Sequence, residues 1–375
     1  MGTFNPFCQP LYIVDIRMEN SSMSLINYSS TVETTTLERD VWKMGNFSWS
    51  DAVICSVFVG IMTVFGIVSN LTTIAVIVKT SKLKSLPFNA LIASLCVSDI
   101  IASCNSPLML YWKTFGYYRY QLPEFFCKVT LPINSWTNTS TIQHILAFML
   151  IRLGAISYPH RLKEFTLRRA KILITVIWIV TFIGNSCFPM WFLRVHGADE
   201  KSFTGTACAT DKAKWPIVRK VSYVRQTFFL YIPMILIVTS TLLLIRLLII
   251  RRNKKQQEKN DNSDVNKENA ALIQLSFIVA SFLIGYLPDF GFRLTLMITN
   301  SMGIEFRGRG PWLFSMLSHL VQRVTECLNP IFYNLGSSHL REATKQFLGF
   351  GEEVNASSIK LSEMQKNNQH TNVSV

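Results

Sequence analysis

Charged residues are scarce in this chain of 375 residues, where Asp, Glu, Lys and Arg together make up 16% of the sequence. In typical soluble domains, charged residues make up about a quarter of the sequence. Hydrophobic residues reach 49%, and the mean hydropathy is +0.27. This apolar excess indicates either a large core or membrane spans, and the length of the apolar runs has to decide between them.

The sequence also lacks the signals of an enzyme or of a nucleic-acid-binding protein. No nucleophile–base pair, metal-ligand spacing or phosphate-binding loop stands out, so we expect no enzymatic activity and no catalytic cofactor. The formal net charge of +14 would suit either nucleic acid or a membrane surface. Because the basic residues lie between long apolar runs, and no basic face is interleaved with aromatic residues, the membrane is favoured.

The segment from Met1 to Lys43 lacks the basic start and compact apolar block of a secretory signal peptide. Three glycosylation sequons precede the first apolar run, at Asn20, Asn27 and Asn46. Their number predicts a glycosylated tail on the extracellular side. We therefore expect the first membrane helix to direct insertion.

Seven apolar runs are long enough to cross about 30 Å of hydrocarbon, which takes roughly 20 helical residues. We expect helices at about 52–78, 87–112, 127–152, 171–193, 222–250, 270–298 and 311–335. Acidic residues precede the first run, and Lys79, Lys82 and Lys84 follow it. This asymmetry places the N-terminus outside and, after seven crossings, the C-terminus inside. The prediction is an all-α, multi-pass protein of the plasma membrane.

The predicted organisation has four parts. Residues 1–50 form the extracellular tail, 51–336 the seven-helix membrane domain, 337–350 a short amphipathic helix, and 351–375 a disordered cytoplasmic tail. The short helix sets apolar residues such as Leu340 and Phe347 against charged ones, as a helix lying on the cytoplasmic membrane interface would.

Most of the predicted spans contain one conspicuous polar, proline or tryptophan residue. These are Asn70, Asp99, Trp178, Pro233, Pro288 and the segment Asn329-Pro330-Ile331-Phe332-Tyr333. Each alone has an ordinary packing explanation, but together and in this order they resemble the rhodopsin-like family of G-protein-coupled receptors, over about residues 50–349. The segment Ser94–Asp99 is also faintly similar to melatonin-receptor-like and Moody-like receptors.

The resemblance implies a polar network at mid-membrane depth. In the family such a network holds a sodium ion in the inactive state, and here it would comprise Asp99, Thr141, Asn329 and Asn70. It also implies that the bend at Pro330 lets Tyr333 swing inward on activation. The alternative is buried hydrogen-bonded packing without switching.

The predicted topology puts two cysteines outside the membrane core, at the start of the third span and in the second extracellular loop. These are Cys127 and Cys208, and an oxidising exterior favours a disulfide between them. Cys8 in the outer tail is left over, and the remaining cysteines lie in predicted spans.

The cytoplasmic end of the third span departs from the family pattern of acid, Arg and aromatic residue. Here it reads Ile151-Arg152-Leu153, so the intrahelical ion pair that restrains the arginine is absent. We expect raised basal signalling unless Glu268 pairs with Arg152 from across the bundle. The resemblance further assigns a rotamer-switch position and a packing cluster to Tyr286, Phe282, Ile142 and Pro233.

The outer half of the bundle indicates the kind of ligand. Asn134 stands where aminergic receptors keep an Asp, and Arg323 stands where opsins keep the retinal-binding Lys, so neither a monoamine nor retinal is expected. The candidate pocket residues are Asn134, Asp289, Arg293, His319, Arg323 and Glu326. Their charges either neutralise one another at helical spacing or leave arginines free for an anionic group of a lipid or a peptide terminus.

The sequence thus predicts a receptor that passes an extracellular signal to a heterotrimeric G protein, with arrestin as a further partner and membrane lipids around it. A transporter or channel and a non-signalling membrane scaffold are the alternatives. The transporter would require internal repeats and paired midplane ions, and we find no similarity between the two halves of the sequence.

Overall fold

The structure is a computed structural model that describes residues 47–158, 165–196, 206–211, 213–257, 262–304, 306 and 308–350, without the side chains of Ile156, Leu248 and residues 251–278. All of these belong to the unit Gly45–Val375. The predicted glycosylation sites Asn20, Asn27 and Asn46, the leftover Cys8 and the tail 351–375 lie outside the described residues.

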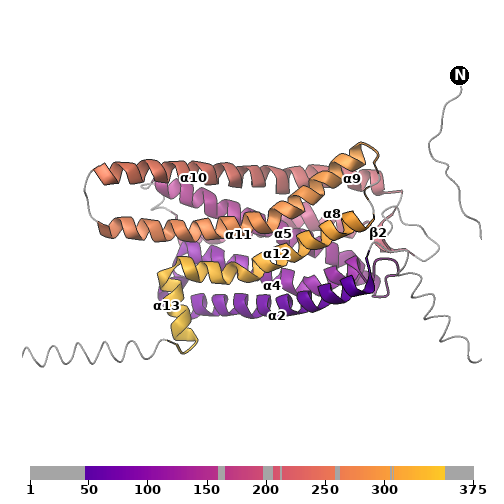
Figure 1. The fold of residues 1–375 in the computed structure, drawn as a ribbon, viewed down its shortest axis with the longest axis horizontal. Coiled ribbons are helices and arrows are strands. Elements are labelled where there is room, and N and C mark those ends of the chain that lie inside the picture. The colour runs from indigo at the N-terminus through magenta and orange to yellow at the C-terminus, as the bar shows by residue number, and fades with distance from the viewer. Residues whose placement is uncertain are drawn as a thin grey trace, which may run out of the picture. The chain divides into compact units, whose positions relative to one another are not determined.

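Seven long helical segments form most of the described part of the chain (Figure 1). In order they are α2 (Trp49–Lys79), α4 (Pro87–Lys113), α5 (Glu124–Ser157), α7 (Leu167–Phe182) continued by η1 (Ile183–Cys187) and α8 (Phe188–Met190), α9 (Trp215–Gln226) continued by η2 (Thr227–Tyr231) and α10 (Ile232–Gln257), α11 (Asn262–Ser301), and α12 (Arg309–Gly336). The short helix α3 (Ser81–Lys84) joins α2 to α4. The predicted all-α, seven-helix class is confirmed.

Four of the segments, Trp49–Lys79, Pro87–Lys113, Leu167–Met190 and Trp215–Leu247, are by length and composition apolar enough to cross a membrane, among the residues searched. The outward side chains of α2 are apolar, with Ile54, Val57, Ile61, Val64 and Val68 all exposed, as a lipid-facing surface requires. The helices α5 and α12 are more polar, but their polar residues are turned inward.

The inward polar faces of α5 and α12 line the interior of the bundle. On α5, Thr137, Ser140 and His144 have no exposed surface, and on α12 Arg323 and Glu326 are 2% and 1% exposed. A polar or charged group is costly in lipid and is therefore found facing the bundle interior. A search by length and composition does not identify α5 and α12 as membrane spans, because their inward-facing polar residues lower the mean hydropathy.

Helix ends follow local sequence signals and differ from the predicted spans. Ser48 caps α2 in a reciprocal pair with Asp51, and Pro87 occupies the first turn of α4. The helical segment that contains α10 runs from Trp215 to Gln257, beyond the predicted 222–250 at both ends. A helix continues through polar residues outside the hydrocarbon, whereas the prediction counted apolar residues only.

Helix α13 (Ser338–Phe347) follows α12 at the end of the bundle away from β2 (Figure 1). Ser337 caps it by accepting from the Leu340 amide at 3.2 Å, and Leu340 is buried in the core. The Lys79 amine lies 4.8 Å from the centre of the Phe347 ring, which ties α13 to α2. The structure therefore has the predicted short helix, and its position on a membrane interface stays a prediction.

The opposite end carries a two-stranded antiparallel hairpin of β1 (Leu193–Val195) and β2 (Cys208–Thr210). Val195 pairs with Cys208, and Leu193 pairs with Thr210. Arg194 and Asp211 form an ion pair at 2.8 Å beside these strands. The hairpin packs against α5 through β1.

Candidate functional site

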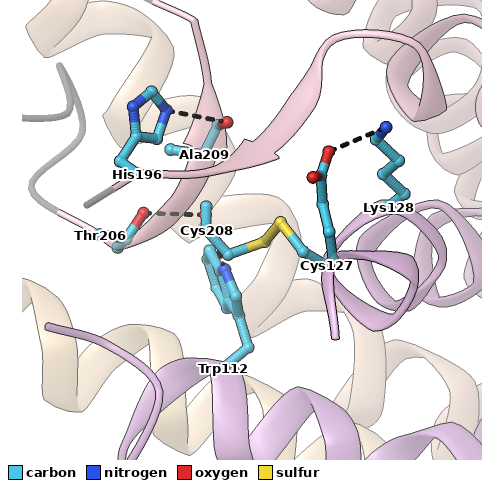
Figure 2. The surroundings of a disulfide bond; sticks show 8 residues. Trp112, Cys127, Lys128, His196, Thr206, Cys208 and Ala209 are labelled. Atoms are coloured by element: carbon cyan, nitrogen blue, oxygen red, sulfur yellow. Dashed lines mark hydrogen bonds and ion pairs between the residues drawn. A yellow bond between two sulfur atoms is a disulfide. The ribbon is translucent and has the colours of Figure 1, made fainter. Parts of the chain in front are cut away.

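A disulfide ties the hairpin to the first turn of α5 (Figure 2). It joins Cys127 to Cys208, both fully buried, so the predicted pairing is confirmed. The Trp112 indole N–H donates to the Cys208 carbonyl at 3.0 Å, and the Thr206 hydroxyl donates to the same oxygen at 3.1 Å. The disulfide holds β2 against α5, and the Trp112 hydrogen bond holds it against α4.

A small pocket, partly open to solvent, lies deeper in the bundle among α5, η1, α9, η2 and α11. Two of the predicted ligand residues, Asp289 and Arg293, line it. They form an ion pair of 2.6 Å between the Arg293 Nε and an Asp289 carboxylate oxygen. The helical spacing of four residues predicts this pairing, and the carboxylate of Asp289 balances the charge of Arg293.

Arg225 on α9 also lines this pocket, and sequence reasoning did not single it out. Its Nη1 donates to the Ser135 hydroxyl at 2.6 Å and lies 3.3 and 3.4 Å from the backbone and side-chain oxygens of Asn185. The signal in the sequence is a lone arginine eight residues before Pro233, inside a predicted span. It was overlooked because no acidic residue stands near it along the chain.

A second ion pair lies at the next level of the bundle, within α12. Arg323 and Glu326 are joined twice, at 2.7 Å between Nη1 and Oε2 and at 2.9 Å between Nη2 and Oε1. Arg323 also donates to the Asn138 side-chain oxygen at 3.2 Å, and Asn138 lines the pocket above. The Tyr286 hydroxyl donates to Glu326 at 2.9 Å. The pair therefore connects α5, α11 and α12 and is not free to bind a ligand.

Asp99 lies near this pair and has one described hydrogen bond, accepted from the Asn329 amide at 3.0 Å. The predicted companion Thr141 shares a hydrogen bond with Ser98 instead, at 3.2 Å. Asn70 donates to the Gly66 carbonyl at 2.9 Å. The second carboxylate oxygen of Asp99 and the side-chain oxygen of Asn70 are buried without a hydrogen-bond partner. Two acceptor atoms are thus left unsatisfied inside the bundle.

The predicted aromatic switch on α11 is tightly enclosed. Tyr286 stacks on Phe282 with ring centres 4.6 Å apart, and both belong to the same core cluster as Ile142. Pro233 is buried on the neighbouring α10. Gly285 allows α12 to come close here, because a Cβ at this position would lie 2.5 Å from the Thr325 hydroxyl oxygen. Tyr286 is therefore held by both a stacked ring and the hydrogen bond to Glu326.

Arg152 lies at the far end of α5, beneath the core. Its guanidinium stands over the Phe88 ring, 4.5 Å from the ring centre, and Ile151 packs against the core cluster. Among the side chains that the structure describes, Arg152 has no acidic partner. The side chain of Glu268 is outside that set, so its pairing with Arg152 stays a prediction.

The remaining predicted residues occupy separate positions. His319 shares a hydrogen bond with Ser106 at 3.3 Å rather than pairing with Arg323. Asn134 is 8% exposed, one turn above Asn138 on α5. Tyr333 on α12, beyond Pro330, is fully buried, and its hydroxyl has no hydrogen-bond partner. The structure thus divides the predicted pocket residues between a lined cavity and an internal polar network.

A helical membrane bundle with an internal polar network and a disulfide-tethered hairpin at one end defines the seven-helix receptor class. A model of the 7 transmembrane receptor (rhodopsin family) matches residues 69–333. Because this match covers more than half of the sequence, the chain belongs to the rhodopsin family of seven-transmembrane receptors.

Individual relatives are more distant. Growth hormone secretagogue receptor type 1 of Sus scrofa is 25% identical over 292 residues, which cover 76% of this chain and 78% of the relative. Neuromedin U receptor homolog nmur-2 of Caenorhabditis elegans is 24% identical over 311 residues, covering 76% of each chain. Galanin receptor 2a of Danio rerio is 25% identical over 304 residues, covering 80% of this chain and 79% of the relative.

Proposed function

We propose that this receptor binds an extracellular peptide and activates a heterotrimeric G protein at the plasma membrane, with its N-terminus outside and its C-terminus in the cytoplasm. The observation that carries the proposal is the unbroken set of contacts from the pocket to the switch residues. Asn138 lines the pocket and accepts from Arg323, Arg323 pairs with Glu326, and Glu326 accepts from Tyr286. The relatives named for neuromedin U, galanin and a growth hormone secretagogue support a peptide ligand.

This chain of contacts gives the ligand a physical route to the cytoplasmic half. A ligand that draws Asn138 toward the pocket weakens its hydrogen bond to Arg323 and so disturbs the ion pair. Tyr286 then loses a fixed acceptor and is free to change rotamer against Phe282. Two discrete arrangements of such a packed element are what couples distant sites. Opening of the far end then releases Arg152 from Phe88 toward the G protein, and arrestin would use the same opened face.

The test is a G-protein dissociation panel on cells that express the chain, with neuromedin U, galanin and a growth hormone secretagogue as trial agonists. Wild type is expected to activate at least one subtype, in the basal state or with an agonist, and Arg152→Ala is expected to abolish that signal.

In the same panel, Ile151→Asp is expected to lower basal activity because it restores an intrahelical partner for Arg152.

Identical readings from wild type and Arg152→Ala across all subtypes, at equal surface expression, would instead support the non-signalling scaffold. Equal basal activity of wild type and Ile151→Asp would count against the raised resting signal.

The polar network also supports a proposed sodium site at Asp99. The unpartnered carboxylate oxygen of Asp99 and the unpartnered amide oxygen of Asn70 are the kind of ligand that a hard cation prefers. Asn329 donates to the other Asp99 oxygen, and Thr141 bonds Ser98, the residue before Asp99. When bound, the ion would supply a positive charge to a carboxylate that Arg323 leaves unpaired, because Arg323 is engaged by Glu326.

Sodium chloride is therefore expected to stabilise the purified receptor relative to choline chloride at equal ionic strength. At a sodium concentration ten times the dissociation constant, the gain in the free energy of unfolding is about 1.4 kcal/mol. Asp99→Asn should remove the difference between the two salts, whereas Cys104→Ser, at a lipid-exposed free cysteine, should keep it. The measurement is the thermal unfolding midpoint, and a sodium effect that survives Asp99→Asn would exclude the site.

A further inference from the structure

The pocket carries more positive than negative charge. Arg225 and Arg293 both line it, and Asp289 is the one carboxylate in its lining among the described residues. The short Asp289–Arg293 ion pair matches one of the two guanidinium groups. The other therefore stands in the outer part of a membrane-spanning helix without a counter-charge, a situation that costs free energy unless something compensates for it.

The contacts of Arg225 leave part of its hydrogen-bonding capacity unused. All its described hydrogen bonds run through Nη1, and their acceptors, the Ser135 hydroxyl and two oxygens of Asn185, are neutral. The Nε is buried without a partner. A guanidinium presents its N–H groups in a planar fork that matches the two oxygens of a carboxylate. Within the described part of the chain, Nη2 meets no protein acceptor.

Two π-helical turns of the backbone bring Arg225 and its acceptor Asn185 together at the pocket. Arg225 lies two residues before the π-helical turn η2, and its acceptor Asn185 lies in the other π-helical turn, η1. The two turns face each other closely, because a Cβ on Gly184 would lie 2.4 Å from the Phe229 ring. Such turns shift the faces of a helix relative to one another and are frequent at functional sites. Here they bring an arginine and an asparagine from different helices to one pocket wall.

The remaining lining indicates what accompanies the anionic group. Ile142, Phe229 and Leu230 provide apolar surface in the same pocket. The free space in the pocket is small and partly open to solvent, so it suits a single small group such as a carboxylate rather than a whole residue. We propose that Arg225 binds a carboxylate of the peptide ligand, and that an apolar part of the ligand next to this carboxylate lies against Phe229 at the pocket. The inference rests on the proposed function and adds the chemistry of the ligand.

Purified full-length receptor in lipid nanodiscs and three N-acetylated peptides test the proposal. The first, Leu-Phe-Leu, ends in a free carboxylate, the second is its C-terminal amide, and the third is an amide with a Glu side chain in the last position. Binding is measured as the concentration-dependent rise of the thermal unfolding midpoint. Wild type should bind at least one carboxylate peptide about tenfold or more tightly than the neutral amide, since a charge-assisted hydrogen bond is lost in the latter.

Arg225→Gln should abolish this preference, and Arg225→Lys should retain part of it as a charge without the planar fork. Arg194→Gln is the matched control, because it removes an arginine that is paired with Asp211 in the hairpin. A preference that persists in Arg225→Gln, or that is absent from wild type, would overturn the proposal. A free-acid preference identifies a peptide terminus, and a Glu preference identifies an acidic side chain.

Receptor without any peptide provides a second readout. If Arg225 is a binding cation, Arg225→Gln should unfold at the wild-type midpoint or above it, because Gln can still donate to Ser135 and the unmatched charge is gone. A clear drop in the midpoint would make Arg225 a structural brace between α5 and η1 and would overturn the proposal. Neither readout depends on a G protein, so failure here is distinguishable from failure of the signalling panel.

Discussion

Glu326→Gln is expected to lower the free energy of unfolding by about 3–5 kcal/mol, because it leaves the buried Arg323 guanidinium without its counter-charge. Arg323 and Glu326 are 2% and 1% exposed, so water cannot take over the lost interaction. The Gln side chain keeps an acceptor for the Tyr286 hydroxyl, which isolates the loss of charge from the loss of that hydrogen bond. The measurement is unfolding in mixed micelles at increasing denaturing detergent.

The double variant Arg323→Met, Glu326→Leu is the control for this prediction. Replacing both members of a buried ion pair by apolar residues of similar volume is often neutral or stabilising. We expect it to recover most of the stability but to lose agonist-dependent signalling, because the route from Asn138 to Tyr286 is cut. Wild-type stability in Glu326→Gln alone would show that Arg323 finds another partner and that the pair is dispensable.

Removal of the disulfide is the second large effect. Cys208→Ser is expected to cost about 2–5 kcal/mol, since the bond closes a long loop and constrains the unfolded chain. The hairpin would still be held by apolar packing around Leu193 and by hydrogen bonds such as that from Trp112 to the Cys208 carbonyl. The matched control is Cys104→Ser, at a free cysteine that is exposed on the bundle surface.

Thermal unfolding and surface staining of intact cells would measure the change. Cys127→Ser should give the same loss as Cys208→Ser, and the double variant should be no worse than either single one, because all three lack the same bond. A double variant that loses the sum of both single effects would show that each cysteine contributes by packing rather than by the bridge.

The sequence predicts the helices well because bilayer thickness imposes a length on each apolar run. It also predicts the ion pairs within α11 and α12, since residues three or four apart on a helix lie side by side. Asp289 with Arg293 and Arg323 with Glu326 both follow that rule. His319, four residues before Arg323, instead bonds Ser106 on α4, because a neighbouring helix offers a hydroxyl at the same depth.

Contacts between helices are what the sequence leaves open. Nothing in the spacing of residues shows that Arg225 meets Ser135 and Asn185, because those partners lie 90 and 40 positions away. The π-helical turns that place them carry no periodicity signal, since each adds a single residue to an otherwise regular helix. The hydrogen bond from Tyr286 to Glu326 depends in the same way on the close approach at Gly285.

The inward polar face of α12 has a consequence for the biosynthesis of the receptor. A central arginine costs about 2.5–3.5 kcal/mol when a helix enters the bilayer by itself, and α12 carries a glutamate as well. Its order of synthesis offers a remedy, because the six earlier segments are complete when α12 emerges from the ribosome. Pairing of Arg323 with Glu326 within one helical turn lowers the free-energy cost of inserting the two charges. Asn138 and Tyr286 supply further hydrogen-bond partners on segments that are already in the membrane. The last helix is thus expected to enter the membrane as a partner of the assembled bundle rather than as an independent span.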